Sequence, residues 1–262
     1  TVDGPKKAWG VPVAHEAVKD DDAGGPVGNP QATPIVVDGV MYLPARGHEV
    51  LALDAATGEP IWRTPVPTPD GTDARGVRYW PGDGQIGPRI FVMSGPTLVA
   101  LDATNGAPAR GFGRDGVKQV AVPYRGTPLI YGNLAIVGAY SGERNQGHAG
   151  DTRAYDARTG ELVWTFHTVP LPGEVGHETW LDHGWRNRSG TNVWAYYMTL
   201  DAANGTLFMP VSSAAGNYWG GDRPGDNLFS NSIVAVDALT GQYRWHFQTV
   251  HHDLWDLDMP NP

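Results

Sequence analysis

The chain has 262 residues and a formal net charge of −9 at pH 7. This acidity argues against a nucleic-acid partner, because a phosphate backbone is bound by an excess of Lys and Arg. The absence of cysteine excludes disulfides and thiolate chemistry, and no apolar run is long enough to predict a transmembrane segment. The 35 glycines and 22 prolines, with 40% hydrophobic residues, favour a turn-rich all-β protein over a disordered chain.

The chain divides into repeated units of predicted strands. Apolar runs broken by turn residues predict paired strands within residues 34–43, 128–137 and 193–209. An inserted loop at 170–192 interrupts the series, and it either covers the mouth of a site or is a plain surface loop. The units span approximately residues 30–67, 75–115, 125–170 and 193–250.

One motif ends each unit. The pattern Ala-x-Asp-x-x-Thr-Gly-x-x-x-Trp occurs at residues 52–62, 154–164 and 235–245, and a weaker copy at 100–106 has Phe112 in place of the tryptophan. Each copy predicts a β-hairpin, because glycine supplies the positive φ of the turn and the aspartate can bond the backbone of that turn. A single Asp-x-x-x-Gly indicates only an ordinary hairpin, but three copies with tryptophan at a fixed offset indicate a structural repeat.

Two hairpins per unit give four strands, and four-stranded units repeated along a chain are typical of a β-propeller. We therefore predict an all-β fold in which residues 1–262 form one partial propeller domain of about four blades. Four blades is the lower limit for a ring, and the sequence reaches Pro262 where a fifth unit would begin. We expect the chain to be a fragment that forms about half of a larger ring.

The last unit is followed by a chemically unusual octamer, residues 251–258, which contains three aspartates, two histidines and a tryptophan. Aspartate and histidine favour the surface and tryptophan favours burial, so this mixture at the end of a strand predicts a lined pocket. The alternative is a polar loop whose tryptophan packs under a neighbouring sheet.

These motifs carry a family resemblance. The repeat resembles the tryptophan-docking motif of quinoprotein dehydrogenases, which are eight-bladed propellers that carry pyrroloquinoline quinone (PQQ). The segment 75–82, with sequence RGVRYWPG, resembles the Arg-Gly-x-x-Tyr-Trp segment of that family, and Asp226-Asn227 resembles its Arg-Pro-Gly-Asp-Asn turn. The octamer is most similar to the membrane-bound glucose dehydrogenase branch. The resemblance implies that the chain is roughly the N-terminal half of an eight-bladed quinoprotein ring.

The resemblance implies three cofactor contacts. Arg75 would lie near the quinone carboxylates, Trp194 would form the floor under the quinone, and Glu143 would be a metal-binding acid beside it. A guanidinium fork and an indole face suit these roles. From the residues alone, Arg75 could equally form a salt bridge at the rim, Trp194 could be a core residue, and Glu143 could be a solvated loop acid.

The resemblance also implies a metal site and a base. Asp256 falls on the catalytic base, and Glu143, Asp256 and Asp258 supply the oxygen ligands that Ca²⁺ prefers. The amide ligand of alcohol-type members aligns near Ala214, which cannot coordinate, so Asn217 is the nearest substitute. Mg²⁺ or a lanthanide is an alternative cation.

The function that the resemblance implies is PQQ-dependent oxidation of a sugar, polyol or other alcohol by hydride transfer to a metal-polarised quinone. It also implies a periplasmic location, with membrane association in the full-length protein as an alternative, and ubiquinone or cytochrome c as the electron acceptor. The competing hypothesis is a non-catalytic propeller that serves as a scaffold for protein partners.

Overall fold

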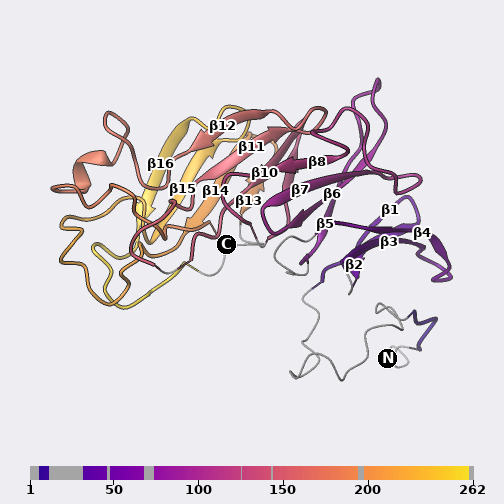
Figure 1. The fold of residues 1–262 in the computed structure, drawn as a ribbon, viewed down its shortest axis with the longest axis horizontal. Coiled ribbons are helices and arrows are strands. Elements are labelled where there is room, and N and C mark those ends of the chain that lie inside the picture. The colour runs from indigo at the N-terminus through magenta and orange to yellow at the C-terminus, as the bar shows by residue number, and fades with distance from the viewer. Residues whose placement is uncertain are drawn as a thin grey trace.

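The computed structural model describes residues 6–11, 32–45, 48–67, 74–124, 126–142, 144–193 and 198–259. Its strands form four antiparallel sheets of four strands each, which follow one another across Figure 1 in chain order. The expected all-β fold with four-stranded units is therefore confirmed. Sheet 1 contains β1 (Ile35–Val37), β2 (Val40–Ala45), β3 (Glu49–Asp54) and β4 (Pro60–Pro65), and sheet 2 contains β5 (Val77–Trp80), β6 (Arg89–Ser94), β7 (Thr97–Asp102) and β8 (Val117–Gln119).

The other two sheets have the same antiparallel order, in which every strand pairs with its sequence neighbour. The one helix among the described residues is a short 3₁₀ turn in the inserted loop, His177–Thr179. Sheet 3 contains β9 (Leu129–Tyr131), β10 (Leu134–Val137), β11 (Thr152–Asp156) and β12 (Leu162–Phe166), and sheet 4 contains β13 (Thr199–Asp201), β14 (Thr206–Val211), β15 (Ser232–Asp237) and β16 (Tyr243–Gln248).

The repeated motif forms the turn between the last two strands of a sheet, as predicted. In sheet 1, Asp54 Oδ1 accepts hydrogen bonds from the backbone N–H groups of Ala56 at 2.9 Å and Thr57 at 2.8 Å. Gly58 follows with a φ of 78°, a left-handed conformation that favours glycine. The aspartate thus satisfies the turn backbone while the glycine allows the chain to reverse.

The motif tryptophans join neighbouring sheets. Trp62 Nε1 in sheet 1 donates to the carbonyl of Ala103 in sheet 2 at 3.0 Å. A Cβ atom on Gly106 would lie 2.7 Å from the Trp62 ring, so only glycine lets the indole approach this closely. Trp164 in sheet 3 makes the same pair of contacts with Ala238 and Gly241 in sheet 4.

Two tryptophans extend this series. Trp9, which lies outside the repeated motif, donates to the carbonyl of Ala55 at 3.2 Å and packs on Gly58, so it docks on sheet 1. Trp245 stands at the same position in sheet 4, where its side chain contacts Phe208 and is 46% exposed. No hydrogen bond within the described part of the chain involves the Trp245 indole.

A separate apolar core fills each space between neighbouring sheets. The core between sheets 1 and 2 includes Val50 and Ile90, and the core between sheets 2 and 3 includes Phe91 and Tyr155. The core between sheets 3 and 4 is built in the same way. Burial of these side chains, at about 25 cal/mol per Å² of apolar area, is the main term that holds the sheets together.

Long loops beside sheets 3 and 4 contain the residues of the candidate site. The inserted loop, at the far left of Figure 1, packs against the loop that joins β14 to β15. Leu181 N donates to the carbonyl of Pro224 at 3.0 Å, and Arg188 pairs with Asp222 at 3.1 Å. The described helix is too short to cross a membrane.

Candidate active site

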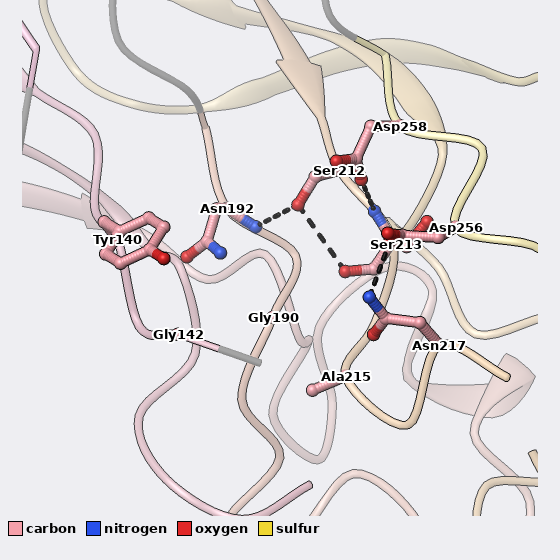
Figure 2. Close-up of a pocket in the computed structure, with 10 residues that line it drawn as sticks. All are labelled: Tyr140, Gly142, Gly190, Asn192, Ser212, Ser213, Ala215, Asn217, Asp256 and Asp258. Atoms are coloured by element: carbon pink, nitrogen blue, oxygen red, sulfur yellow. Dashed lines mark hydrogen bonds between the residues drawn. The ribbon is translucent and has the colours of Figure 1, made fainter. Parts of the chain in front are cut away.

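A small cavity of about 20 Å³ lies where these loops meet the segment after β16. A volume of this size holds one water molecule or one ion. Figure 2 shows the lining residues on the loops that follow strands of sheets 3 and 4. The lining residues are Tyr140, Gly142, Gly190, Asn192, Ser212, Ser213, Ala215, Asn217, Asp256 and Asp258.

The structure brings three of the predicted site residues together at this cavity. Asn217 Nδ2 donates to Asp256 Oδ1 at 2.6 Å, as the dashed line in Figure 2 shows. Asp258 Oδ1 accepts a hydrogen bond from the backbone N–H of Ser213 at 3.0 Å. Two carboxylates and one amide, from segments that are distant in sequence, therefore share one wall.

The three remaining predicted residues, Glu143, Trp194 and Arg75, are not among the described residues that line this cavity. Glu143 and Trp194 lie outside the described residues, although Gly142, the sequence neighbour of Glu143, lines the cavity. Arg75 lies just before β5 in sheet 2, where its carbonyl accepts a hydrogen bond from Thr33 N at 3.0 Å. It is not among the described residues that line this cavity, and its quinone contact stays a prediction.

Neither histidine of the octamer is among the described residues that line the cavity. His252 Nδ1 hydrogen-bonds the carbonyl of Gly225 at 2.8 Å, and His251 Nδ1 lies 3.6 Å from Asp226 Oδ1. Trp255 is 64% exposed, so it does not pack under a neighbouring sheet. The octamer therefore lines the pocket through Asp256 and Asp258, and neither its histidines nor its tryptophan is among the described lining residues.

Sequence reasoning missed the hydroxyl and amide groups that also line the cavity. Asn192 Oδ1 accepts from Ser141 N at 2.8 Å, and Ser212 Oγ accepts from Asn192 N at 2.9 Å. The inserted loop ends at the cavity, because Gly190 and Asn192 line it. The only signal for these residues in the sequence is the small-residue run Ser212–Ala215 after β14, which is too common a pattern to predict a site.

Negative charge is concentrated at the aspartate wall. Burial raises the pKa of Asp258, and the charges of Asp256 and Asp253 raise it further, against the lowering effect of the Ser213 N–H group. Within the described residues, no three His, Cys, Asp or Glu side chains form a complete metal-binding group. A cation at Asp256 and Asp258 would therefore need Asn217 or a residue outside the described ranges as a further ligand.

Comparison with known proteins assigns the chain to a family. The model for the PQQ family "Glucose/ethanol/alcohol dehydrogenase, beta-propeller domain" matches residues 1–262. The chain belongs to this family of PQQ-dependent dehydrogenase propellers. The predicted resemblance to quinoproteins is thereby confirmed, and so is the β-propeller fold.

Relatives of this chain include enzymes that differ in their named substrates. The quinohemoprotein alcohol dehydrogenase ADH-IIG of Pseudomonas putida is 34% identical over 86% of this chain and 33% of its own length. Quinoprotein glucose dehydrogenase A of Acinetobacter calcoaceticus is 29% identical over 98% of this chain and 36% of its own length. The chain thus spans about a third of the length of these curated relatives.

Solved structures agree with the family assignment. The structure of the ADH-IIG enzyme from Pseudomonas putida superimposes with a TM-score of 0.71 at 33% identity, over 86% of this chain and 34% of the other. A europium-containing methanol dehydrogenase gives a TM-score of 0.70 at 25% identity, over 86% of this chain and 42% of the other. Four sheets of a PQQ-dependent dehydrogenase propeller therefore account for the described fold.

Proposed function

We propose that the protein containing this chain oxidises a sugar, polyol or other alcohol with PQQ, and that the cavity beside Asp256 is its cation and base site. The observation that carries this proposal is the convergence of Asn217, Asp256 and Asp258 on one ion-sized cavity in a chain of the PQQ-dependent family. The identity of the relatives supports the reaction class, and their range of named substrates leaves several alcohol classes open.

The residues present fit a hard cation. Carboxylate and amide oxygens are the ligands that Ca²⁺ favours. A cation would offset both the burial and the repulsion from Asp256 that raise the pKa of Asp258. The Asn217 amide now presents its Nδ2 donor to Asp256. A 180° turn of this amide would exchange its nitrogen and oxygen and aim Oδ1 at a bound ion. Glu143 is proposed as a further ligand, and Mg²⁺ or a lanthanide as an alternative ion.

A bound PQQ would supply the two-electron acceptor for hydride transfer. Arg75 is proposed to bind the carboxylates of this cofactor and Trp194 to stack beneath its rings, because a guanidinium fork and an indole face suit those contacts. The described residues leave Asp256 half-buried at the edge of the cavity, where a small substrate can approach its carboxylate.

Asp256 would act as the general base. Oxidation of an alcohol removes the hydroxyl proton and a hydride from the adjacent carbon, and a carboxylate within hydrogen-bond reach of the hydroxyl can accept that proton. Before a cation binds, Asn217 would hold the Asp256 carboxylate through its contact at 2.6 Å, and afterwards the shared cation would hold both side chains. The proposed location is the periplasm, and the proposed electron acceptor is ubiquinone or cytochrome c.

Asp256→Asn tests this function in the full-length protein loaded with PQQ and Ca²⁺. We expect this variant to lose at least about 100-fold in alcohol-dependent dye reduction, since a positioned base typically contributes that much. Asp226→Asn is the matched control, because it removes one negative charge nearby from a side chain that is 56% exposed. An Asp256→Asn protein that retains PQQ and turns over at the normal rate would contradict the assignment.

A non-catalytic scaffold is the competing function. Such a propeller has no use for a cavity lined by two aspartates and an asparagine, which favours the enzyme. Dialysis of the full-length protein after addition of PQQ and Ca²⁺ separates the two functions, because only the enzyme should retain the quinone absorbance.

A further inference from the structure

A buried aspartate lies directly behind the proposed site. Asp253 is 1% exposed, and its carboxylate accepts four hydrogen bonds. Asp253 Oδ1 accepts from Trp255 N at 3.0 Å, and Oδ2 accepts from Leu257 N at 2.8 Å. Ser213 Oγ donates to Oδ2 at 2.5 Å, and Asn231 Nδ2 donates to it at 3.1 Å.

The two backbone hydrogen bonds enclose Asp256. They fix the N–H groups of Trp255 and Leu257, the residues on either side of it. Asp256 itself has a φ of 58°, a left-handed conformation that costs a non-glycine residue about 1 kcal/mol or more. Such a conformation persists only where the surrounding contacts determine it, and the Asp253 carboxylate supplies two of these contacts.

The same network reaches the second carboxylate. Ser213, whose hydroxyl bonds Asp253, donates its backbone N–H to Asp258. Asn231 Nδ2 also donates to the carbonyl of Leu257 at 2.7 Å. Arg223, which is fully buried, donates to the carbonyl of Asp253 at 2.5 Å. Asp253 is therefore the point at which the segments carrying Asp256 and Asp258 are tied to the loop after β14.

We propose that Asp253 is a positioning residue that fixes the separation of the Asp256 and Asp258 carboxylates and thereby determines how tightly the site binds its cation. This inference rests on the proposed function, since it concerns the same cation site. Asp253 does not line the cavity among the described residues, so it acts through the backbone of the 255–257 segment and through Ser213.

Asparagine cannot replace this carboxylate. All four partners approach as donors, two of them backbone N–H groups that cannot change role. Whichever way the amide introduced by Asp253→Asn were turned, its NH₂ group would face one of these N–H groups, and that donor would lose its acceptor. A buried donor without a partner costs about 1–3 kcal/mol, which is enough to release the turn that holds Asp256.

The test uses the full-length protein and Tb³⁺ as a cation probe, without PQQ. Excitation of nearby tryptophan, which Trp255 can provide, sensitises Tb³⁺ emission, and the midpoint of a titration gives an affinity that does not depend on turnover. Ca²⁺ competition then gives the Ca²⁺ affinity. The variants are Asp253→Asn, Asp256→Asn and the control Asp237→Asn. Asp237 accepts two backbone N–H groups at Oδ1 in a turn of sheet 4, away from the cavity. Its Oδ2 accepts a hydrogen bond from Arg244 at 2.8 Å, which the amide would lose.

We expect Asp253→Asn to weaken cation affinity by roughly 10- to 100-fold, as is usual for residues that orient metal ligands. With PQQ added, kcat should fall further than KM changes. Asp237→Asn should lower Tm and leave the affinity within about twofold of the wild type. If Asp253→Asn lowers Tm as Asp237→Asn does but keeps wild-type cation affinity and kcat, the role of Asp253 is only structural and the inference is wrong.

A milder variant covers the case in which Asp253→Asn does not fold. Asn231→Gly keeps the φ of 50° at that position accessible and removes the amide that donates to Asp253, Leu257 and Ser213. We expect a loss of about three- to tenfold in Tb³⁺ affinity, and an unchanged affinity would overturn the proposal. If Asp256→Asn itself binds the cation and turns over normally, the proposed function fails. If only the Asp253 and Asn231 variants behave as wild type, the positioning role alone fails.

Discussion

The guanidinium of Arg89 supplies the hydrogen bond that Phe112 cannot make in sheet 2. Arg89 Nη1 donates to the carbonyl of Ala157 at 2.6 Å, and Ala157 occupies the position that Ala103 and Ala238 have in the other docked turns. Phe112 packs against Gly160 in place of an indole, and a Cβ atom on Gly160 would lie 3.3 Å from the Phe112 ring. The guanidinium lies 5.9 Å from the Phe112 ring centre, so a phenyl ring and an arginine together replace one tryptophan.

Removal of Arg89 should therefore loosen the contact between sheets 2 and 3. Arg89→Met would leave the carbonyls of Ala157, Arg158 and Arg110 without this donor, and we expect the free energy of unfolding to fall by about 3 kcal/mol. Chemical denaturation measures the loss. Adding Phe112→Trp should recover at least about 1 kcal/mol, because the indole N–H can reach Ala157, whereas no recovery would mean that the two arrangements are not equivalent.

The glycine of the docking motif should tolerate substitution less well than an unpacked glycine with the same backbone. Gly106 has a φ of 74° and would place a Cβ 2.7 Å from Trp62, while Gly39 has a φ of 79° and open space around it. Both alanine variants should lose about 1 kcal/mol to left-handed strain. Gly106→Ala should lose about 1–3 kcal/mol more through overpacking, and equal Tm values for the two variants would contradict the docking role.

The two motif tryptophans at the ends of sheets 3 and 4 should differ in their contribution to stability. Trp164 is 7% exposed and docked on Gly241, so Trp164→Ala should cost about 3–5 kcal/mol in this chain. Trp245 is 46% exposed, and Trp245→Ala should cost less than about 1 kcal/mol. Denaturation of both variants checks this, and a large loss for Trp245→Ala would show that its indole is already docked.

The stability of the chain should depend on pH through the turn aspartates. The hydrogen bonds from Arg158 lower the pKa of Asp156 more than burial raises it. A carboxyl group with a lowered folded pKa contributes stability that is present above its unfolded value, near about 3.9, and is lost as pH falls through the folded value. The difference in Tm between the wild type and Asp156→Asn should therefore be constant near pH 7 and shrink below about pH 4.

Asn105→Ala is the control for this pH series. Asn105 Oδ1 accepts the N–H of Ala107 at 2.9 Å in the equivalent region of sheet 2, and its amide does not ionise. Its loss should lower Tm by the same amount at every pH. If the difference in Tm between the wild type and Asp156→Asn also stays constant down to about pH 2.5, the Asp156 carboxylate is not held in its charged form.

The sequence by itself determined the repeat and therefore the fold. The Asp-x-x-Thr-Gly turns follow from local chemistry, because an aspartate that bonds its own turn and a glycine that adopts positive φ need no distant partner. The fixed offset of the tryptophans indicated a repeated contact. The candidate residues Asn217, Asp256 and Asp258 came from the family resemblance, and the cavity then showed that they lie together.

Only the tertiary structure decided which side chains support those residues and how the sheets are joined. The role of Asp253 depends on Ser213 and Asn231, which lie in another loop, and the roles of Trp9 and Arg89 depend on carbonyls of a neighbouring sheet. Such contacts leave no periodic trace in the sequence, because each joins segments that meet only after the sheets have packed. Local turns are fixed by neighbouring residues, whereas a buried hydrogen-bond network is fixed by the packing that encloses it.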